Sequence, residues 1–263
     1  MDNLRRYGTP PFNVAVVHGG PGAAGEMAPV ARELSTRWGV LEPLQMATSI
    51  SGQVEELKAI LETEGDLPTT LIGFSWGAWL SFIFAASYPK MVKKLILVGS
   101  GPFQEKYAAR ISETRLSRLS DEERTEVGSI VQILETSDNF EAGEKNSALA
   151  RMGALFSKAD AYDPAACESE VVDFRADVFQ AVWKEAARLR RTGKILELGK
   201  RIECPVVAIH GNYDPHPAEG VERPLSAVLN NFRFVLLEKC GHSPWIERQA
   251  KEKFYEILEE ELE

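Results

Sequence analysis

The sequence has few cysteines and no long hydrophobic run. Its three cysteines, Cys167, Cys204 and Cys240, form no metal-spaced pair, so they predict reduced thiols rather than disulfides or a zinc site. No stretch reaches the roughly 18 apolar residues of a membrane span, and the first residues contain no apolar signal core. We therefore expect a cytoplasmic protein without a membrane partner or a metal ion.

The chain also has no excess of positive charge, because its 30 lysines and arginines are outnumbered by 39 acidic residues. The formal net charge is −9, and the basic clusters at 93–94 and 188–191 are short. Because nucleic acids and anionic membranes are bound through clustered lysine and arginine, this balance argues against both as partners. What the chain does have is length and apolar content. With 263 residues, 44% of them hydrophobic, it can bury a full core in one α/β domain that carries a lid.

Short apolar runs alternate with amphipathic stretches along the chain. This alternation is typical of a mainly parallel sheet with helices on both faces. Strands are expected at 13–17, 39–44, 69–72, 94–98, 205–209 and 232–237, and helices at 25–37, 52–64, 76–88 and 244–262. Because the first strand begins near Asn13, we expect about six strands and a sheet trimmed at its N-terminal edge. Such an open edge favours pairing with a second copy, so a homo-oligomer is one expectation.

The alternation is interrupted once, between Phe103 and Ile195, where no run predicts a strand. Helices are predicted at 121–135, which begins with a capping box at Ser120–Glu123, and at 171–191. We expect this segment to be a helical lid, residues 103–195. It is inserted into a core domain made of residues 1–102 and 196–263.

The most informative motif is the pentapeptide Gly73-Phe74-Ser75-Trp76-Gly77, between an expected strand and an expected helix. A serine at such a sharp turn is lifted to the end of the sheet, where a substrate can reach its hydroxyl. The flanking glycines are expected because the turn is strained and the helix must pack closely on the strand. The pattern predicts a nucleophile elbow.

A serine nucleophile needs a base, and the base needs an acid to orient it. The best base is His242, in the loop between the last strand and the last helix. His216 is its rival, but it shares a loop with the best acid, Asp214, and we expect that this acid cannot easily orient it. His18 and His210 end apolar strands and are expected to be packed or hydrogen-bonded. The order serine, aspartate, histidine is the one expected of one hydrolase fold.

A tetrahedral intermediate also needs backbone N–H groups that stabilise its oxyanion. The glycine-rich loop His18-Gly19-Gly20-Pro21-Gly22 is placed to present one such donor. The backbone N–H of Trp76, at the start of the elbow helix, would be the second. No Gly-Lys-Ser/Thr follows the loop, so it does not predict a phosphate cradle.

These parts together resemble the α/β-hydrolase fold superfamily, from Asn13 to the C-terminus. The resemblance implies Ser75 as nucleophile, Asp214 as acid and His242 as base. It also implies Gly20 and Trp76 as the backbone donors of the oxyanion hole.

The loop at 18–22, with a tryptophan after the serine, looks most like the proline iminopeptidase branch, whose members remove an N-terminal proline from peptides. In that branch, acidic lid residues hold the free amine of the substrate. Asp173, Asp177 and Glu185 are the acids to which this role would fall, and a solvated acidic helix face explains them as well.

We expect a serine hydrolase that cleaves a small ester or amide through an acyl-enzyme, with no cofactor. Its substrate contacts are expected among the lid aromatics, unless these only pack the lid: Phe103, Phe156, Phe174, Phe179 and Trp183. Three alternatives stay open. They are an iminopeptidase-like aminopeptidase, a lyase or acyltransferase that uses the same triad, and a non-catalytic binding protein.

Overall fold

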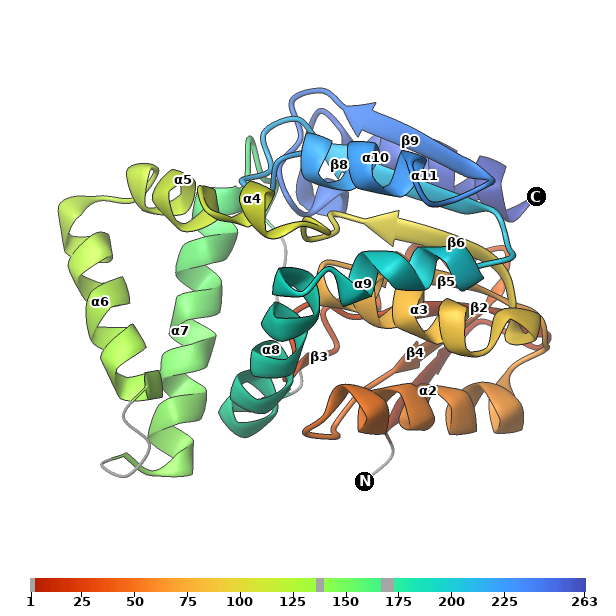
Figure 1. Ribbon diagram of the computed structural model, residues 1–263, viewed down its shortest axis with the longest axis horizontal. Coiled ribbons are helices and arrows are strands. Elements are labelled where there is room, and N and C mark those ends of the chain that lie inside the picture. Colours follow the sequence, from red (N-terminus) through yellow and green to blue (C-terminus); the bar gives the residue numbers. More distant parts are fainter. Residues whose placement is uncertain (1–2, 136–139, 167–172) are drawn as a thin grey trace.

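A seven-stranded sheet runs through the centre of the molecule (Figure 1). The computed structural model describes residues 3–135, 140–166 and 173–263. The strand order is β1-β4-β2-β5-β6-β8-β9, and every pairing is parallel except that of β1 with β4. The strands are β1 (Leu4–Tyr7), β2 (Phe12–Val17), β4 (Gly39–Pro43), β5 (Thr69–Phe74), β6 (Val92–Val98), β8 (Val206–Gly211) and β9 (Phe232–Leu237). The expected fold class is confirmed.

Strand β1 is the one strand of the seven-stranded sheet that the sequence analysis missed. It pairs antiparallel with β4, so the sheet has seven strands and its N-terminal edge is not trimmed. Two arginines lie within the strand and hide its apolar pattern. It is held in part by polar bonds, because Tyr7 donates to the buried carboxylate of Glu42 (2.8 Å). The open edge on which we based self-association is therefore covered by β1.

Helices cover both faces of the sheet. Alternate strand residues point to opposite faces, so that Leu95 and Ile96 of β6 belong to two different clusters. On one face lie α2 (Ile50–Glu64), α3 (Trp76–Ser87) and α10 (Glu219–Ser226), and on the other lie α1 (Ala28–Leu34) and α11 (Lys251–Leu262). α3 is apolar almost all round and is buried along its length, which fixes the elbow at its N-terminus. No helix of the described residues is long and apolar enough to cross a membrane.

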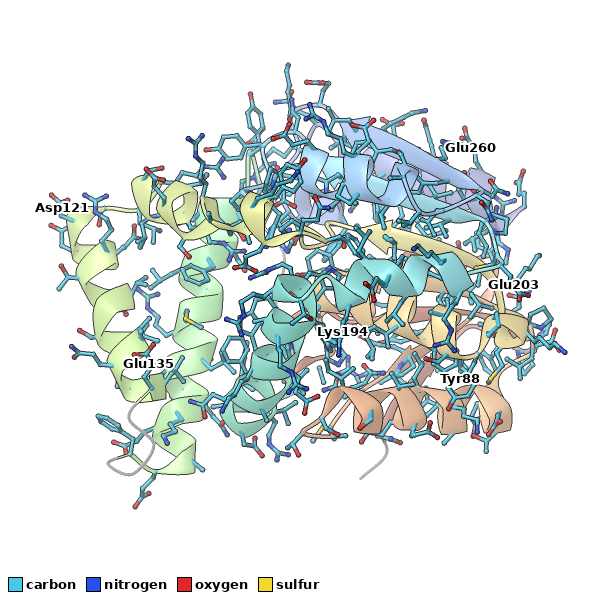
Figure 2. The ribbon with its side chains drawn as sticks, in the orientation of Figure 1. Tyr88, Asp121, Glu135, Lys194, Glu203 and Glu260 are labelled. Carbon is cyan, nitrogen blue, oxygen red and sulfur yellow. The ribbon has the colours of Figure 1, made fainter. Side chains whose placement is uncertain are left out.

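A helical layer lies between β6 and β8 in the chain and projects from the sheet in Figure 1. It consists of α4 (Glu105–Ala108), α5 (Ile111–Ser117), α6 (Asp121–Glu135), α7 (Ala142–Asp160) and α8 (Ala176–Arg191), and the short α9 (Lys194–Glu197) leads back to the sheet. α6 and α7 share a hydrophobic cluster of their own. Charged side chains such as Asp121 lie at the outer edge of this helical layer (Figure 2).

The expected helix at 121–135 is confirmed, including the reciprocal bonds of its capping box between Ser120 and Glu123. The expectation of an all-helical segment is wrong in one place. A two-residue strand, β7 (Asp173–Phe174), pairs with β3 (Ala23–Ala24), and the helix that follows begins only at Ala176. Residues 171–172 of the expected helix, and Cys167, lie outside the described residues. α7 was also missed.

Candidate active site

The turn after β5 has the backbone of a nucleophile elbow. Ser75 has φ 51° and ψ −111°, in the left-handed half of conformational space that a serine rarely adopts. Its N–H donates to the carbonyl of Val98 (2.9 Å), and its own carbonyl accepts from Ala78 (3.2 Å) in the first turn of α3. The strain is held because both neighbouring elements are buried, and it indicates a functional position.

Both glycines of the pentapeptide are sterically required, as the sequence predicts. A Cβ on Gly77 would lie 2.2 Å from the carbonyl oxygen of Val17, and one on Gly73 would lie 2.3 Å from the carbonyl oxygen of Gly77. The first contact shows that α3 starts directly against the end of β2. The elbow and the glycine-rich loop after β2 are therefore neighbours in space.

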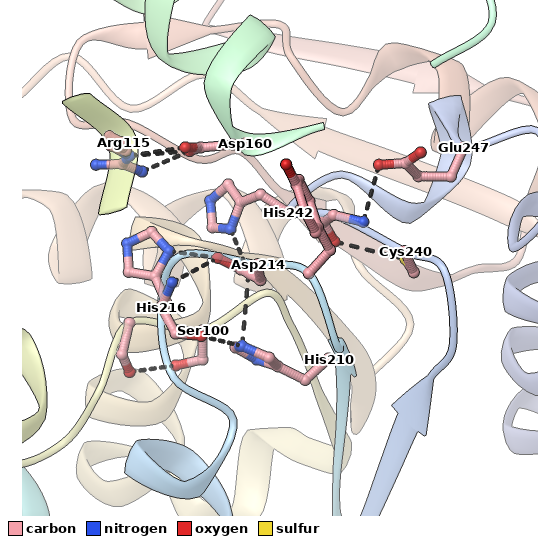
Figure 3. A network of polar contacts seen from close by, with 12 residues as sticks. Ser100, Arg115, Asp160, His210, Asp214, His216, Cys240, His242 and Glu247 are labelled. Carbon is pink, nitrogen blue, oxygen red and sulfur yellow. Dashed lines mark hydrogen bonds and ion pairs between the residues drawn. The ribbon is translucent and has the colours of Figure 1, made fainter. Parts of the chain in front are cut away.

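His242 and Asp214 meet at this same edge of the sheet (Figure 3). Nδ1 of His242 lies 2.6 Å from Oδ2 of Asp214, whose side chain is fully buried. The imidazole also packs on Phe74, the residue before Ser75, with ring centroids 4.8 Å apart. A histidine held by a buried carboxylate thus lies beside the elbow.

Burial by itself lowers the pKa of His242, but the charge of Asp214 and the hydrogen bond to it outweigh burial, so the pKa lies above its ordinary value. Burial opposes ionisation of Asp214, and the surrounding imidazoles nevertheless hold its pKa well below the usual range. The carboxylate is therefore charged, and the proton of the pair resides on the imidazole.

His216 lies on the same carboxylate, and our expectation that Asp214 cannot orient it is wrong. Its Nδ1 is 2.7 Å from Oδ1 of Asp214, and its backbone N–H donates to the same oxygen (2.8 Å). The sequence argument failed because a turn of two residues folds the side chain back onto its neighbour. His210 is hydrogen-bonded, as predicted: its Nε2 donates to the carbonyl of His216 (2.8 Å).

The buried side chain of His18 holds the glycine-rich loop through two hydrogen bonds. Nδ1 of this residue bonds to the carbonyl of Gly19 (2.7 Å), and Nε2 accepts from the backbone N–H of Gln45 (3.3 Å). Burial lowers its pKa to about 4, so the ring is neutral, as this pair of bonds requires. His18 is therefore a packed histidine, as the sequence predicts.

The two expected oxyanion donors lie on either side of the contact between the loop and α3. Gly20 has φ +31°, and its carbonyl accepts from Ala23 (2.9 Å) in a tight turn. Trp76 is the first residue of α3, where backbone N–H groups have no partner within the helix. Its indole is not available for a ligand, because Nε1 donates to Gln53 inside the core (2.9 Å).

Sequence reasoning missed two carboxylates near His242. Glu26 lies against Gly19, whose added Cβ would be 2.5 Å from its Oε2. Burial raises the pKa of Glu26 to about 7, although the charge of His242 and a hydrogen bond with the Gly19 backbone favour ionisation. No sequence signal marked Glu26, because only the folded chain brings it close to His242.

The second carboxylate is Glu247, which is fully buried. It accepts the backbone N–H groups of Gly241, Tyr162 and Asp163, each at 2.8 Å. The first belongs to the His242 loop (Figure 3), and the other two follow α7. The backbone N–H of His242 also donates to the carbonyl of Asp160, the last residue of α7 (3.0 Å). The loop of His242 is thus tied to the end of α7 and the residues that follow it.

The five expected aromatic contacts lie in different environments. Phe103 is fully buried against Trp79 and Phe82, which accounts for it without a ligand. Phe156 lies under the guanidinium of Arg115 (4.8 Å). Phe174 packs on the hydrophobic cluster that α6 and α7 share. Phe179 and Trp183 stack on one another (6.3 Å), and Trp183 is 40% exposed.

Two of the acids considered for a substrate amine are engaged elsewhere. Asp177 pairs with Arg175 (2.7 Å), and Glu185 accepts the backbone N–H of Ile50 (3.0 Å). The side chain of Asp173 lies outside the described residues.

Among the described residues, Asp214, His216 and His242 place one donor atom each within 4.8 Å of one another. Both Nδ1 atoms carry the protons bound by Asp214, so in this arrangement they offer no lone pair to a metal ion. Burial raises the pKa of the neighbouring Cys240 thiol, which makes it a buried apolar residue rather than a thiolate.

Comparison with known proteins places the chain in a family. The family described as the alpha/beta hydrolase fold matches residues 48–249, and the chain belongs to it. No curated protein matches the chain.

Solved structures show the same fold over nearly the whole chain. One is a thermophilic esterase from Thermogutta terrifontis (19% identity, TM-score 0.65, covering 98% of this chain and 92% of the other). Another is a monoacylglycerol lipase from Paleococcus ferrophilus (17%, 0.62, 98% and 97%). A third is Est816, described as an N-acyl homoserine lactone degrading enzyme (14%, 0.63, 98% and 95%). At such identities the likeness shows the fold alone.

Proposed function

We propose that the protein is a serine hydrolase that cleaves a small ester or amide through an acyl-enzyme. The observation that carries the proposal is the 2.6 Å bond between Asp214 and His242, made where the imidazole packs beside the strained elbow of Ser75. Structures of the same fold that are described as an esterase and a lipase support an ester as substrate class.

In this mechanism Nε2 of His242 takes the proton of the Ser75 hydroxyl as its oxygen attacks the substrate carbonyl. Asp214 binds the Nδ1 proton, which leaves Nε2 unprotonated, and its charge stabilises the imidazolium that forms. The backbone N–H groups of Gly20 and Trp76 bind the oxyanion, each contributing roughly 3 kcal/mol to transition-state stability. The imidazolium then protonates the leaving group, and water activated by His242 releases the acid.

A fluorophosphonate probe tests the nucleophile. We expect the wild-type protein to be labelled at neutral pH, Ser75→Ala not to be labelled, and the exposed lid variant Ser129→Ala to be labelled like wild type. Labelling of Ser75→Ala at the wild-type rate would show that the nucleophile is another residue. No labelling of the wild type would favour a non-catalytic binding protein.

An iminopeptidase-like aminopeptidase is the alternative within the same chemistry. It has less support, because Asp177 and Glu185 are already engaged. Turnover of short acyl esters but not of prolyl amides is the expected result, and the reverse would establish the aminopeptidase. Mass spectrometry of the quenched reaction separates hydrolysis and acyl transfer, which form an acyl-enzyme on Ser75, from lyase chemistry, which does not.

A further inference from the structure

His216 has no step in the proposed mechanism, yet it makes two of the hydrogen bonds to Asp214. Both its Nδ1 (2.7 Å) and its backbone N–H (2.8 Å) are bound to Oδ1. Oδ2 is bound by His242 (2.6 Å), and Nε2 of His210 lies 3.5 Å from the same oxygen. Because the hydrogen bonds of His216 and His242 go to different oxygens, the carboxylate plane is fixed from both sides (Figure 3).

The position of His216 is itself fixed. Its ring stacks on that of His242, with centroids 4.6 Å apart and planes at 27°. Its carbonyl accepts from Nε2 of His210, which is buried at the end of β8. Three imidazoles and one carboxylate therefore form one connected network.

We propose that His216 is a positioning residue: its ring N–H holds Oδ1 of Asp214, which aims Oδ2 at His242 and draws off part of the charge that the carboxylate offers to the base. This inference rests on the proposed role of His242.

His216 is not a second base. Burial lowers its pKa to about 4 despite the opposing charge of Asp214. Two stacked imidazolium rings would also repel one another. The ring of His216 therefore stays neutral when His242 takes the proton of Ser75.

Charged groups of the described residues other than Asp214 also face His242, but none of them is bound to the Asp214 carboxylate. Asp160, at the end of α7, is paired with Arg115 of α5 through bonds of 2.6–3.1 Å, so the charges of this pair largely offset one another. Glu26, in the loop before α1, interacts electrostatically with His242. Unlike these charged groups, the neutral ring of His216 is hydrogen-bonded to the carboxylate that binds His242.

Two substitutions separate the ring N–H from the ring itself. His216→Phe keeps a ring and loses the donor, whereas the amide of His216→Asn can donate to Oδ1 from the place of Nδ1. Without the donor, Asp214 binds the imidazolium of His242 more strongly. We therefore expect the pKa of His242 to rise by about half a unit to one unit in His216→Phe, and to stay at its wild-type value in His216→Asn.

Two measurements are made on each variant. The first is the pH dependence of the rate constant for fluorophosphonate labelling, whose acidic limb should move to higher pH in His216→Phe. Its plateau should fall about tenfold, because Oδ1 then keeps only the bond from the backbone N–H of residue 216 and the carboxylate is held less firmly. The second is the NMR titration of the His242 ring proton in the Ser75→Ala background, assigned with His242→Gln.

Equal titration of His242 in both variants and in the wild-type sequence would overturn the proposal. So would an equal shift in both variants, because the ring rather than its N–H would then be responsible. The NMR titration does not depend on activity. A protein that is never labelled but whose His242 titration shifts only in His216→Phe would refute the proposed hydrolase and leave the role of His216 intact.

Discussion

At the scale of single residues, the site depends on one carboxylate whose acceptor positions are almost all in use. Asp214 accepts from His242 and twice from His216, with His210 3.5 Å from Oδ2. An amide at this position could accept at one oxygen only and would present a donor at the other. The charge and the orientation of the base therefore depend on the same side chain.

Asp214→Asn should lower the rate of fluorophosphonate labelling by about 10³–10⁴-fold, because His242 is then held in the wrong tautomer and its imidazolium is not stabilised. The measurement is the second-order labelling rate constant at neutral pH. Asp121→Asn, at the exposed start of α6, is the matched control and should label like wild type. A loss of less than tenfold in Asp214→Asn would show that this carboxylate does not orient the base.

The triad candidates could be read from the sequence because their context is local. Ser75 is marked by flanking glycines, and Asp214 and His242 each follow a strand that the apolar pattern reveals. Glu26 and Glu247 could not be found in this way. Glu247 bonds to residues 84 and 85 positions away, and only the packed lid brings these together.

At the scale of elements, the packing of α3 against β2 determines where the elbow lies. The contact is between Gly77 and the carbonyl oxygens of Val17 and His18, at the beginning of the glycine-rich loop. A helix that starts this close to a strand has no room for a side chain at that point.

Gly77→Ala should destabilise the protein by about 3 kcal/mol and nearly abolish labelling, because α3 must move away from β2 and carry Ser75 and Trp76 with it. Gly128→Ala on α6 is the control, since a Cβ there meets nothing within 4 Å. It should be neutral or stabilise by up to about 1 kcal/mol through helix propensity. Denaturant unfolding measures both. Equal stability of the two variants would contradict the close contact.

Glu247→Gln should slow labelling about tenfold while the protein stays folded. The amide keeps one acceptor oxygen but turns an N–H₂ group toward a backbone donor, which loosens the tie between the His242 loop and the residues after α7. Glu56→Gln is the control, because Glu56 binds two backbone N–H groups through one oxygen and an amide oxygen can replace it. Matching labelling rates in the two variants would show that the tie does not position the base.

The strands that the sequence missed are those whose pairing is not driven by apolar burial. β1 is held by a polar cluster around Glu42, and β3 and β7 contain only two residues each. The central strands were predicted to within two residues at each end, because they are buried on both faces and read as unbroken apolar runs.

At the scale of the whole molecule, stability should depend on pH through the buried histidine His18. The folded protein holds the pKa of His18 at about 4, whereas the unfolded chain has an ordinary value near 6.5. Between these values the unfolded state binds more protons, so the free energy of unfolding falls as the pH drops from 6.5 to 4.

This one group should lower the free energy of unfolding by about 3 kcal/mol over that range. In His18→Asn the loss should be smaller by the same amount, even though the variant is less stable at neutral pH. Urea unfolding at pH 7, 5.5 and 4.5 measures the difference. Parallel pH dependence in both proteins would mean that His18 does not stay neutral on folding.

The helical layer between β6 and β8 contacts both parts of the candidate site. β7 pairs with β3, and the N–H of Arg175 donates to the carbonyl of Gly22 in the glycine-rich loop (2.8 Å), while the carbonyl of Asp160 at the end of α7 accepts from the N–H of His242. Replacing this helical layer with that of a relative, in order to change the substrate, would therefore also change the positions of the glycine-rich loop and of His242. Grafts that keep residues 160–163 and 173–175 of this chain should retain turnover, and grafts cut inside them should lose it whatever pocket they bring.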